Sequence, residues 1–197
     1  MEEQSEFRTR LRTIGVFSML LAVFGAVGVF AYFATFSRPV TTVILVRHAE
    51  KNNEPDNPNP NLSPAGHERA QELARLLSNA GVTAIYASQY VRTQQTVQPT
   101  ANQMRLPVVQ IDARNTDELV QQISTKNRGG VVLIAGHNNT VPAAIAALGG
   151  GSFPVIPENE FDNMFIVTIY RFGKAKVVKL KYGKASASSG GTGTMIP

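Results

Sequence analysis

The sequence predicts an α/β fold, in which a mostly parallel sheet with helices on both faces follows one transmembrane helix. Short apolar runs rich in β-branched residues alternate with helical segments along residues 43–147, as in doubly wound proteins. Before them lies an uncharged segment, Thr13 to Ser37. We expect four parts: a flank (1–12), a transmembrane helix (13–37), a folded domain (38–183) and a flexible Ser/Gly-rich tail (184–197).

The uncharged N-terminal segment has the length of a membrane anchor. At about 1.5 Å per residue, Ile14 to Phe36 can cross a hydrocarbon core of roughly 30 Å. A buried core helix rarely runs this far without a charge, and a cleaved signal peptide has a shorter apolar region before a small-residue site. Three arginines precede the span and only Arg38 follows it closely. The positive-inside rule therefore puts the folded domain outside the cytoplasm, on the periplasmic side in a bacterium.

The folded domain divides into strands and helices at clear breaks in the pattern. The expected strands are 43–46, 82–87, 106–112, 131–135, and a closing hairpin of 165–172 and 175–182 about a Gly173-Lys174 turn. The expected helices begin at Ser63-Pro64, after Ser88, near Asp117 and at Pro142. Asn79 to Gly81 should end the first of these helices. In the last strand Val178, Leu180 and Tyr182 alternate with lysines, which indicates a half-exposed edge.

Charged and imidazole side chains follow three of the expected strands. Arg47 and His48 come directly after 43–46, and His137 follows 131–135. Arg92 lies in the first turn of the helix after 82–87. Because parallel strands end at one edge of a sheet, where such folds bind ligands, these four residues should meet. Two guanidiniums and two imidazoles predict an anion site, beside a Pro/Asn-rich loop at 52–61.

Composition narrows the chemistry further. The chain has no cysteine, no zinc-ligand spacing and no glycine-rich nucleotide motif, so we expect no metal and no cofactor. The net charge of +5 comes mostly from basic residues beyond Asp162. These could serve nucleic acid, anionic lipid or an anionic substrate, but a solvated strand face explains them more simply. No aromatic platform apart from Tyr182 interleaves the lysines, so no nucleic-acid partner is expected.

At these residues the chain resembles a known family. The stretches V-R-H-A (46–49), L-S-P-A-G-H-E-R-A-Q (62–71), I-Y-A-S-Q-Y-V-R-T-Q-Q-T (85–96) and V-L-I-A-G-H-N-N-T (132–140) are similar to the histidine phosphatase superfamily. The resemblance covers residues 41–183 and implies the phosphoglycerate-mutase-like fold. The small phosphohistidine-phosphatase branch is closest in size. The domain at 38–183 is therefore expected to be a histidine phosphatase domain.

The resemblance implies a role for each matched residue. His48 would accept the phosphoryl group, and Arg47, Arg92 and His137 would hold its oxygens. Such a set supplies positive charge around the transferred group without a metal. The implied protein is a membrane-anchored, metal-independent phosphoric monoester hydrolase acting on a phosphorylated small molecule, lipid or protein.

Two departures from the family pattern bear on the mechanism. Ala49 replaces the commoner glycine, and Asn138 stands where the acid-phosphatase branch has aspartate. Asp117, Asp112 and Glu118 lie in about the right region for a general acid, with Asp117 preferred. Without a well-placed acid, good leaving groups such as phosphohistidine, acyl phosphate or pyrophosphate are favoured, and a mutase is not. The alternative is a weak or inactive member that binds phosphorylated ligands or anionic lipid headgroups.

Overall fold

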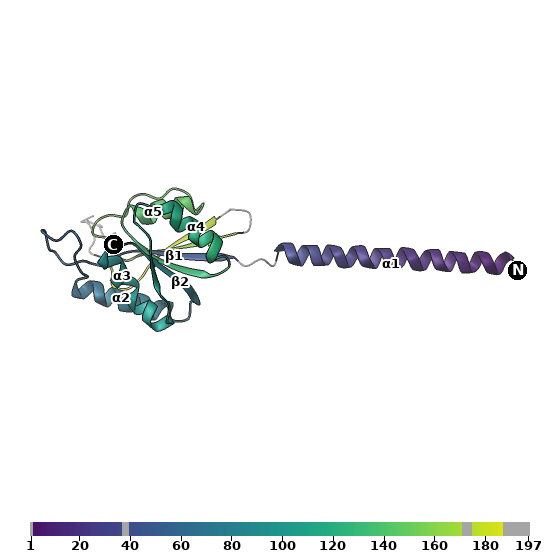
Figure 1. Ribbon diagram of the computed structural model, residues 1–197, viewed down its shortest axis with the longest axis horizontal. Coiled ribbons are helices and arrows are strands. Elements are labelled where there is room, and N and C mark those ends of the chain that lie inside the picture. The colour runs from purple at the N-terminus through teal and green to yellow at the C-terminus, as the bar shows by residue number, and fades with distance from the viewer. Residues whose placement is uncertain (1, 37–39, 171–174, 187–197) are drawn as a thin grey trace, which may run out of the picture. The chain divides into compact units, whose positions relative to one another are not determined.

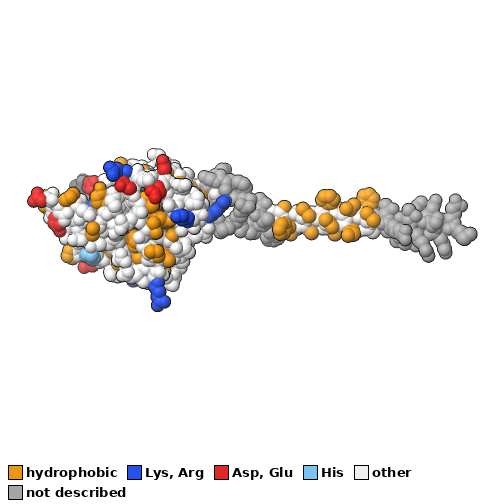
Figure 2. Space-filling model, in the orientation of Figure 1, with side chains coloured by type: hydrophobic (Ala, Val, Ile, Leu, Met, Phe, Trp, Pro, Cys, Tyr) orange, Lys and Arg blue, Asp and Glu red, His pale blue; other side chains and the backbone are white. Residues whose placement is uncertain are grey.

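The computed structural model describes residues 2–36, 40–170 and 175–186, with side chains for 15–32, 40–170 and 175–186. The chain forms two compact units, Met1–Arg38 and Pro39–Pro197. The first unit is one helix, α1 (Glu2–Phe36). Within it, Gly15–Tyr32 is apolar enough to cross a membrane, and none of this window is buried. Figure 2 shows hydrophobic side chains along this part of α1. A signal sequence would have the same features.

The second unit is built on a six-stranded sheet with the order β3-β2-β4-β1-β5-β6. The strands are β1 (Thr41–Arg47), β2 (Val82–Ala87), β3 (Val108–Gln110), β4 (Val131–Gly136), β5 (Asn163–Ile169) and β6 (Ala175–Lys181). The first four are parallel. However, β5 pairs antiparallel with β1 and with β6, so the sheet is mixed and the expected mostly parallel sheet is wrong.

The path of the chain after β4 explains why the sheet is mixed. Helix α5 (Thr140–Ala147) leads away from the edge where β4 ends. The next segment, 148–162, then returns to that edge, where the Ile156 amide donates to the Asn138 carbonyl at 3.0 Å. Strand β5 therefore starts where β1 ends and must run in the opposite direction.

Helices cover both faces of the sheet (Figure 1). On one face α2 (Pro64–Leu77) and α3 (Val91–Met104) bury Leu73 and Val97 against Ile44 and its neighbours. On the other, α4 (Thr116–Lys126) and α5 pack on alternate residues of β1, including Leu45. The strand β1 is thus buried on both faces, as its continuous apolar run predicts. At about 25 cal/mol per Å², this burial is the main force that holds the strand ends in place.

The start of α2 lies against the segment that follows His48. Ser63 caps the helix by accepting from the Gly66 amide at 3.2 Å, and Pro64 occupies the first turn, as predicted. A Cβ at Gly66 would overlap the carbonyl oxygen of Glu50, so glycine permits this close approach. The helix ends at Leu77, slightly before the expected stop.

The two edge strands differ from expectation. Strand β3 is only three residues long, because Arg105 has a left-handed backbone and Pro107 cannot donate to a ladder. In β6, Val178 and Leu180 are exposed instead of facing the core. This follows from the outermost position of β6. Of its residues only Ala175 and Val177 pack against the core, and Tyr182, just after the strand, is buried in it.

The C-terminal end of the described chain is attached to the domain. The backbone carbonyl of Lys184 accepts from Arg69 at 2.9 Å, and the Ser186 hydroxyl accepts from the Phe161 amide at 2.8 Å. The remainder of the expected tail, 187–197, and the expected Gly173-Lys174 turn lie outside the described residues.

Candidate active site

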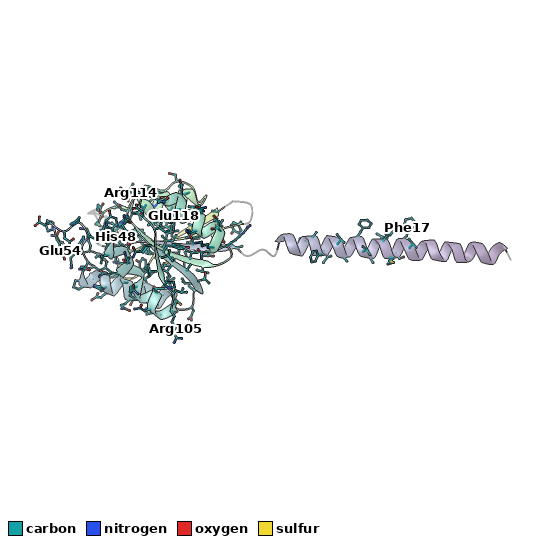
Figure 3. All side chains as sticks on the ribbon, in the orientation of Figure 1. Phe17, His48, Glu54, Arg105, Arg114 and Glu118 are labelled. Atoms are coloured by element: carbon teal, nitrogen blue, oxygen red, sulfur yellow. The ribbon has the colours of Figure 1, made fainter. Side chains whose placement is uncertain are left out.

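Three adjacent parallel strands, β2, β4 and β1, bring the four predicted residues to one edge of the sheet. Arg47 is the last residue of β1 and His48 follows it, while His137 follows β4. Arg92 is in the first turn of α3, just after β2. The rings of His48 and His137 lie 5.4 Å apart, centroid to centroid. In Figure 3 His48 lies within the folded unit, whereas Glu54 and Arg105 project from it.

The His48 ring is oriented as a nucleophile requires. Its Nδ1 lies 2.8 Å from the backbone carbonyl of Ala49, and because a carbonyl only accepts, Nδ1 carries the hydrogen. In the neutral ring Nε2 then keeps its lone pair. Burial, together with the nearby charges of Arg47 and Arg92, lowers the pKa of His48 to about 3. The imidazole is therefore unprotonated at Nε2 at neutral pH.

His137 is fixed by hydroxyl groups. Its Nε2 lies 2.9 Å from Ser88 Oγ, which in turn lies 2.8 Å from Thr93 Oγ1. The Thr93 hydroxyl has one hydrogen and donates it to the backbone carbonyl of Tyr90 at 2.7 Å. Ser88 therefore donates to Thr93 and accepts from His137, so Nε2 of His137 carries the hydrogen. Burial, followed by the charges of Arg92 and Arg47, lowers the pKa of His137 to about 4.

Arg47 divides its donors between the protein and the site. Nη1 donates to the carbonyls of Pro157, Glu158 and Glu160 at 2.8, 2.8 and 3.2 Å. Nη2 donates to the Glu158 carboxylate at 2.7 Å. The guanidinium also lies over the Phe161 ring, 4.4 Å from its centroid. Nε is buried and has no partner in the described part of the chain.

Arg92 shares two of these features, the aromatic contact and the unpartnered Nε. Its guanidinium lies over the Tyr90 ring at 4.4 Å, and its Nε is also buried without a partner among the described residues. Burial lowers the pKa of both guanidiniums, and the neighbouring positive charge of Arg47 adds to the effect on Arg92. A buried N–H without a partner costs about 1–3 kcal/mol. Two of them on cationic groups fit an oxyanion that accepts from both.

The surrounding residues hold the loop after His48 in place. The Ala49 amide donates to Thr96 Oγ1 at 2.9 Å, and Glu50 forms an ion pair with Arg69 at 2.7 Å. A cleft of about 550 Å³ opens along Arg92 and His137. Its other lining residues include Tyr90, Arg114, Asn138 and Asn139.

The acids suggested from the sequence lie away from these four residues. Asp112 forms an ion pair with exposed Arg114, and this hydrogen-bonded contact lowers its pKa. Glu118 accepts from Asn115 at the start of α4, and Asp117 is exposed on the same turn. None of the three has a described hydrogen bond to the histidines or to Arg47 and Arg92.

Glu158 is the carboxylate that the sequence reasoning missed. It accepts from Arg47 on one oxygen and from Asn138 Nδ2 on the other, at 2.7 and 2.6 Å. It lies in an irregular segment far from the four motifs, so no strand or helix pattern marks it. Phe161 lies in the same irregular segment. Ser88 and Tyr90 lie within the stretch 85–96, but their contacts with His137 and Arg92 form only in the fold, so the sequence assigns them no role.

The described residues contain no cluster of histidine and acidic side chains able to hold a metal ion. The two arginines and two histidines instead offer donors, a lone pair and positive charge. These groups can bind a tetrahedral oxyanion and present a nucleophile to it.

The chain is similar to known phosphatases in part of its sequence and in its fold. A model of the histidine phosphatase superfamily (branch 1) matches residues 43–115, which include Arg47, His48 and Arg92 but not His137. No curated protein sequence matched the chain.

Solved structures of proteins with this fold align with most of the folded unit. The protein histidine phosphatase SixA complexed with tungstate is 17% identical with a TM-score of 0.58, covering 71% of this chain and 96% of its own. A SixA phosphohistidine phosphatase candidate from Agrobacterium tumefaciens is 21% identical with a TM-score of 0.53, covering 73% and 97%. A mycobacterial glucosyl-3-phosphoglycerate phosphatase is 11% identical with a TM-score of 0.56, covering 73% and 98%.

These findings support a relationship of residues 43–115 to the histidine phosphatase superfamily and a shared fold for the second unit. At such identities the structural similarity shows the fold alone, so the reaction must be argued from the site itself.

Proposed function

We propose that this chain is a metal-independent phosphatase that hydrolyses a phosphorylated substrate through a phosphohistidine on His48. The main support is the pair of unpartnered Nε–H groups of Arg47 and Arg92 beside an unprotonated His48. A phosphoryl group would satisfy both donors and lie within reach of the nucleophile.

The reaction would run in two steps. His48 Nε2 attacks phosphorus while the bond to the leaving group breaks, and Arg47 and Arg92 hold the equatorial oxygens. His137 already donates its one N–H to Ser88, so it would join them by taking a second proton on Nδ1 once the dianion is bound. Water then attacks the phosphohistidine, the P–N bond breaks, and phosphate leaves. Because Nδ1 stays bonded to the Ala49 carbonyl, the ring keeps its orientation through both steps. A covalent intermediate divides one difficult hydrolysis into two easier steps.

The substrate would be a phosphorylated small molecule, lipid or protein, and phosphohistidine fits the SixA-like fold. We further propose that residues 14–36 anchor the enzyme in a membrane, with the phosphatase domain on the extracytoplasmic side. The apolar window Gly15–Tyr32 and the arginines before it support this arrangement.

The test uses the full-length chain in a mild detergent. Wild type, His48→Ala and His67→Ala are compared for hydrolysis of an aryl phosphate, with and without EDTA. His67 is exposed on α2, so its variant is the matched control for loss of an imidazole. We expect EDTA-resistant turnover in wild type and His67→Ala, and none in His48→Ala. Acid-labile, base-stable phosphate should also be trapped on wild type and on His67→Ala, but not on His48→Ala.

The proposal would be contradicted if the folded wild type neither hydrolysed the aryl phosphate nor trapped phosphate from phosphoramidate. If tungstate still bound to that protein, the alternative of a phosphate-binding, inactive family member would replace it.

A further inference from the structure

The segment 148–162 brings a carboxylate to the mouth of the site. Its backbone carbonyls bind Arg47 Nη1, and the Ile156 amide binds the loop after His137. This places the Glu158 carboxylate between Arg47 Nη2 and Asn138 Nδ2, with 79% of its side chain exposed. Glu158 thus bonds to the residue before His48 and to the residue after His137, while remaining open to solvent.

We expect the leaving group on the solvent-exposed side of the site, where the Glu158 carboxylate is also exposed. Phosphoryl transfer is in line, so the leaving oxygen departs opposite the nucleophile. His48 is only 4% exposed and attacks from within. The leaving group must then face the open mouth, where Glu158 is located. A proton donor is useful at that position.

We propose that Glu158 is the proton donor and acceptor of this site, and that it takes up its proton when an oxyanion replaces it on Arg47. The inference rests on the proposed phosphatase function and deepens it. In the free protein, the Glu158 carboxylate accepts from Arg47 on one oxygen and from Asn138 on the other. Once a phosphoryl dianion binds Arg47, the carboxylate loses its cation and faces a negative group, and both changes favour a proton on the carboxylate.

The other charges around Glu158 do not reverse this argument. Arg92 has no described hydrogen bond to Glu158, and the oxyanion would also take its charge. His48 and His137 are unprotonated, and Glu50 is neutralised by Arg69. Glu160, on the same segment, is held by Lys181 and Asn163. The binding of a dianion therefore leaves Glu158 as the carboxylate that gains a negative neighbour.

Glu158 would supply the proton needed in the first step and recover one in the second. As His48 bonds to phosphorus and the P–O bond breaks, the Glu158 proton passes to the leaving oxygen. As water attacks and the P–N bond breaks, the carboxylate accepts a proton from that water. It releases this proton when phosphate leaves and the pair with Arg47 forms again. With such a proton donor, the enzyme would also hydrolyse substrates with poor leaving groups, such as alkyl and phenyl monoesters.

The first test is the dependence of rate on the leaving group. Wild type, Glu158→Gln and Glu160→Gln, all as full chains in detergent, are compared on aryl phosphates from 2,4-dinitrophenyl to phenyl. Glu160 is the matched control, because its carboxylate bonds to β5 and β6 instead of Arg47. We expect Glu158→Gln to slow phenyl phosphate roughly 100-fold or more, the range of general acid catalysis, and the dinitrophenyl ester only a few-fold. Glu160→Gln should keep the wild-type profile.

The second test measures the proton directly. Tungstate is a tetrahedral dianion that carries no proton near neutral pH, so its binding enthalpy in buffers of different ionisation enthalpy reports uptake by the protein. We expect wild type to take up about one proton more than Glu158→Gln for each tungstate bound.

The outcomes separate this inference from the proposed function. If Glu158→Gln slows all esters equally, Glu158 only positions Arg47 and the inference is wrong. Equal proton uptake in wild type and Glu158→Gln would place the proton elsewhere and also overturn it. If folded wild type neither binds tungstate nor hydrolyses any ester, the phosphatase proposal itself fails.

Discussion

Replacement of His48 by asparagine should make the folded unit less sensitive to acid. Asparagine keeps a nitrogen donor near the position of Nδ1, so the bond to the Ala49 carbonyl can persist. It removes the imidazole, which is buried and whose pKa is lowered to about 3. The unfolded chain binds a proton on this ring near its ordinary pKa of 6.5, whereas the folded chain does not until about pH 3. Wild-type stability should therefore fall as the pH drops through this window.

The size of the effect follows from linkage. At pH 5 the ordinary pKa of 6.5 lies 1.5 units above the solution pH. At about 1.36 kcal/mol per unit, protonation of the unfolded chain at His48 costs wild type about 2 kcal/mol of unfolding free energy. This loss disappears in His48→Asn, while the losses from His137 and from the carboxylates are common to both proteins.

The assay is denaturant unfolding of the full chain in detergent at pH 7 and pH 5, followed by circular dichroism. The drop in unfolding free energy between the two pH values should be about 2 kcal/mol smaller for His48→Asn than for wild type. An equal drop in both proteins would show that the folded state protonates His48 easily. The argument for a neutral nucleophile held by burial would then be refuted.

Three further predictions concern stability and location. Gly66→Ala should destabilise the folded unit by about 1–3 kcal/mol in the same assay, because its Cβ overlaps the Glu50 carbonyl; an unchanged midpoint would show that the loop can move aside. Arg69→Met should cost about 3 kcal/mol, since it leaves Glu50 without its buried cation, and the double variant with Glu50→Gln should recover part of that loss. The full chain should resist carbonate extraction from membranes, whereas a chain lacking residues 15–32 should be released; release of both would contradict an anchor.

Local sequence patterns predict the strands that carry the site. Continuous apolar runs end in Arg47-His48 and in Gly136-His137, and the rule for parallel strands brings these ends together. The cap at Ser63 was also predictable, because a serine followed by proline sets both the first hydrogen bond and the first dihedral angle of a helix.

The direction of β5 was not predictable from periodicity. A parallel and an antiparallel strand show similar apolar alternation, and only the return path of segment 148–162 decides between them. The carboxylate partner of Arg47 was missed for a related reason. Glu158 is 111 positions away in sequence, and nothing in its own neighbourhood records the contact.

The division of Arg47 donors has a consequence for how its variants should be interpreted. Nη1 of Arg47 donates to three carbonyls of segment 148–162, while Nε is buried and has no partner among the described residues. A lysine would present a single ammonium to both tasks and could not perform them together. A rate loss in any Arg47 variant would combine a missing ligand contact with a displaced Glu158 loop. A substitution at Arg47 therefore cannot change the proposed anion contact without also changing the position of segment 148–162.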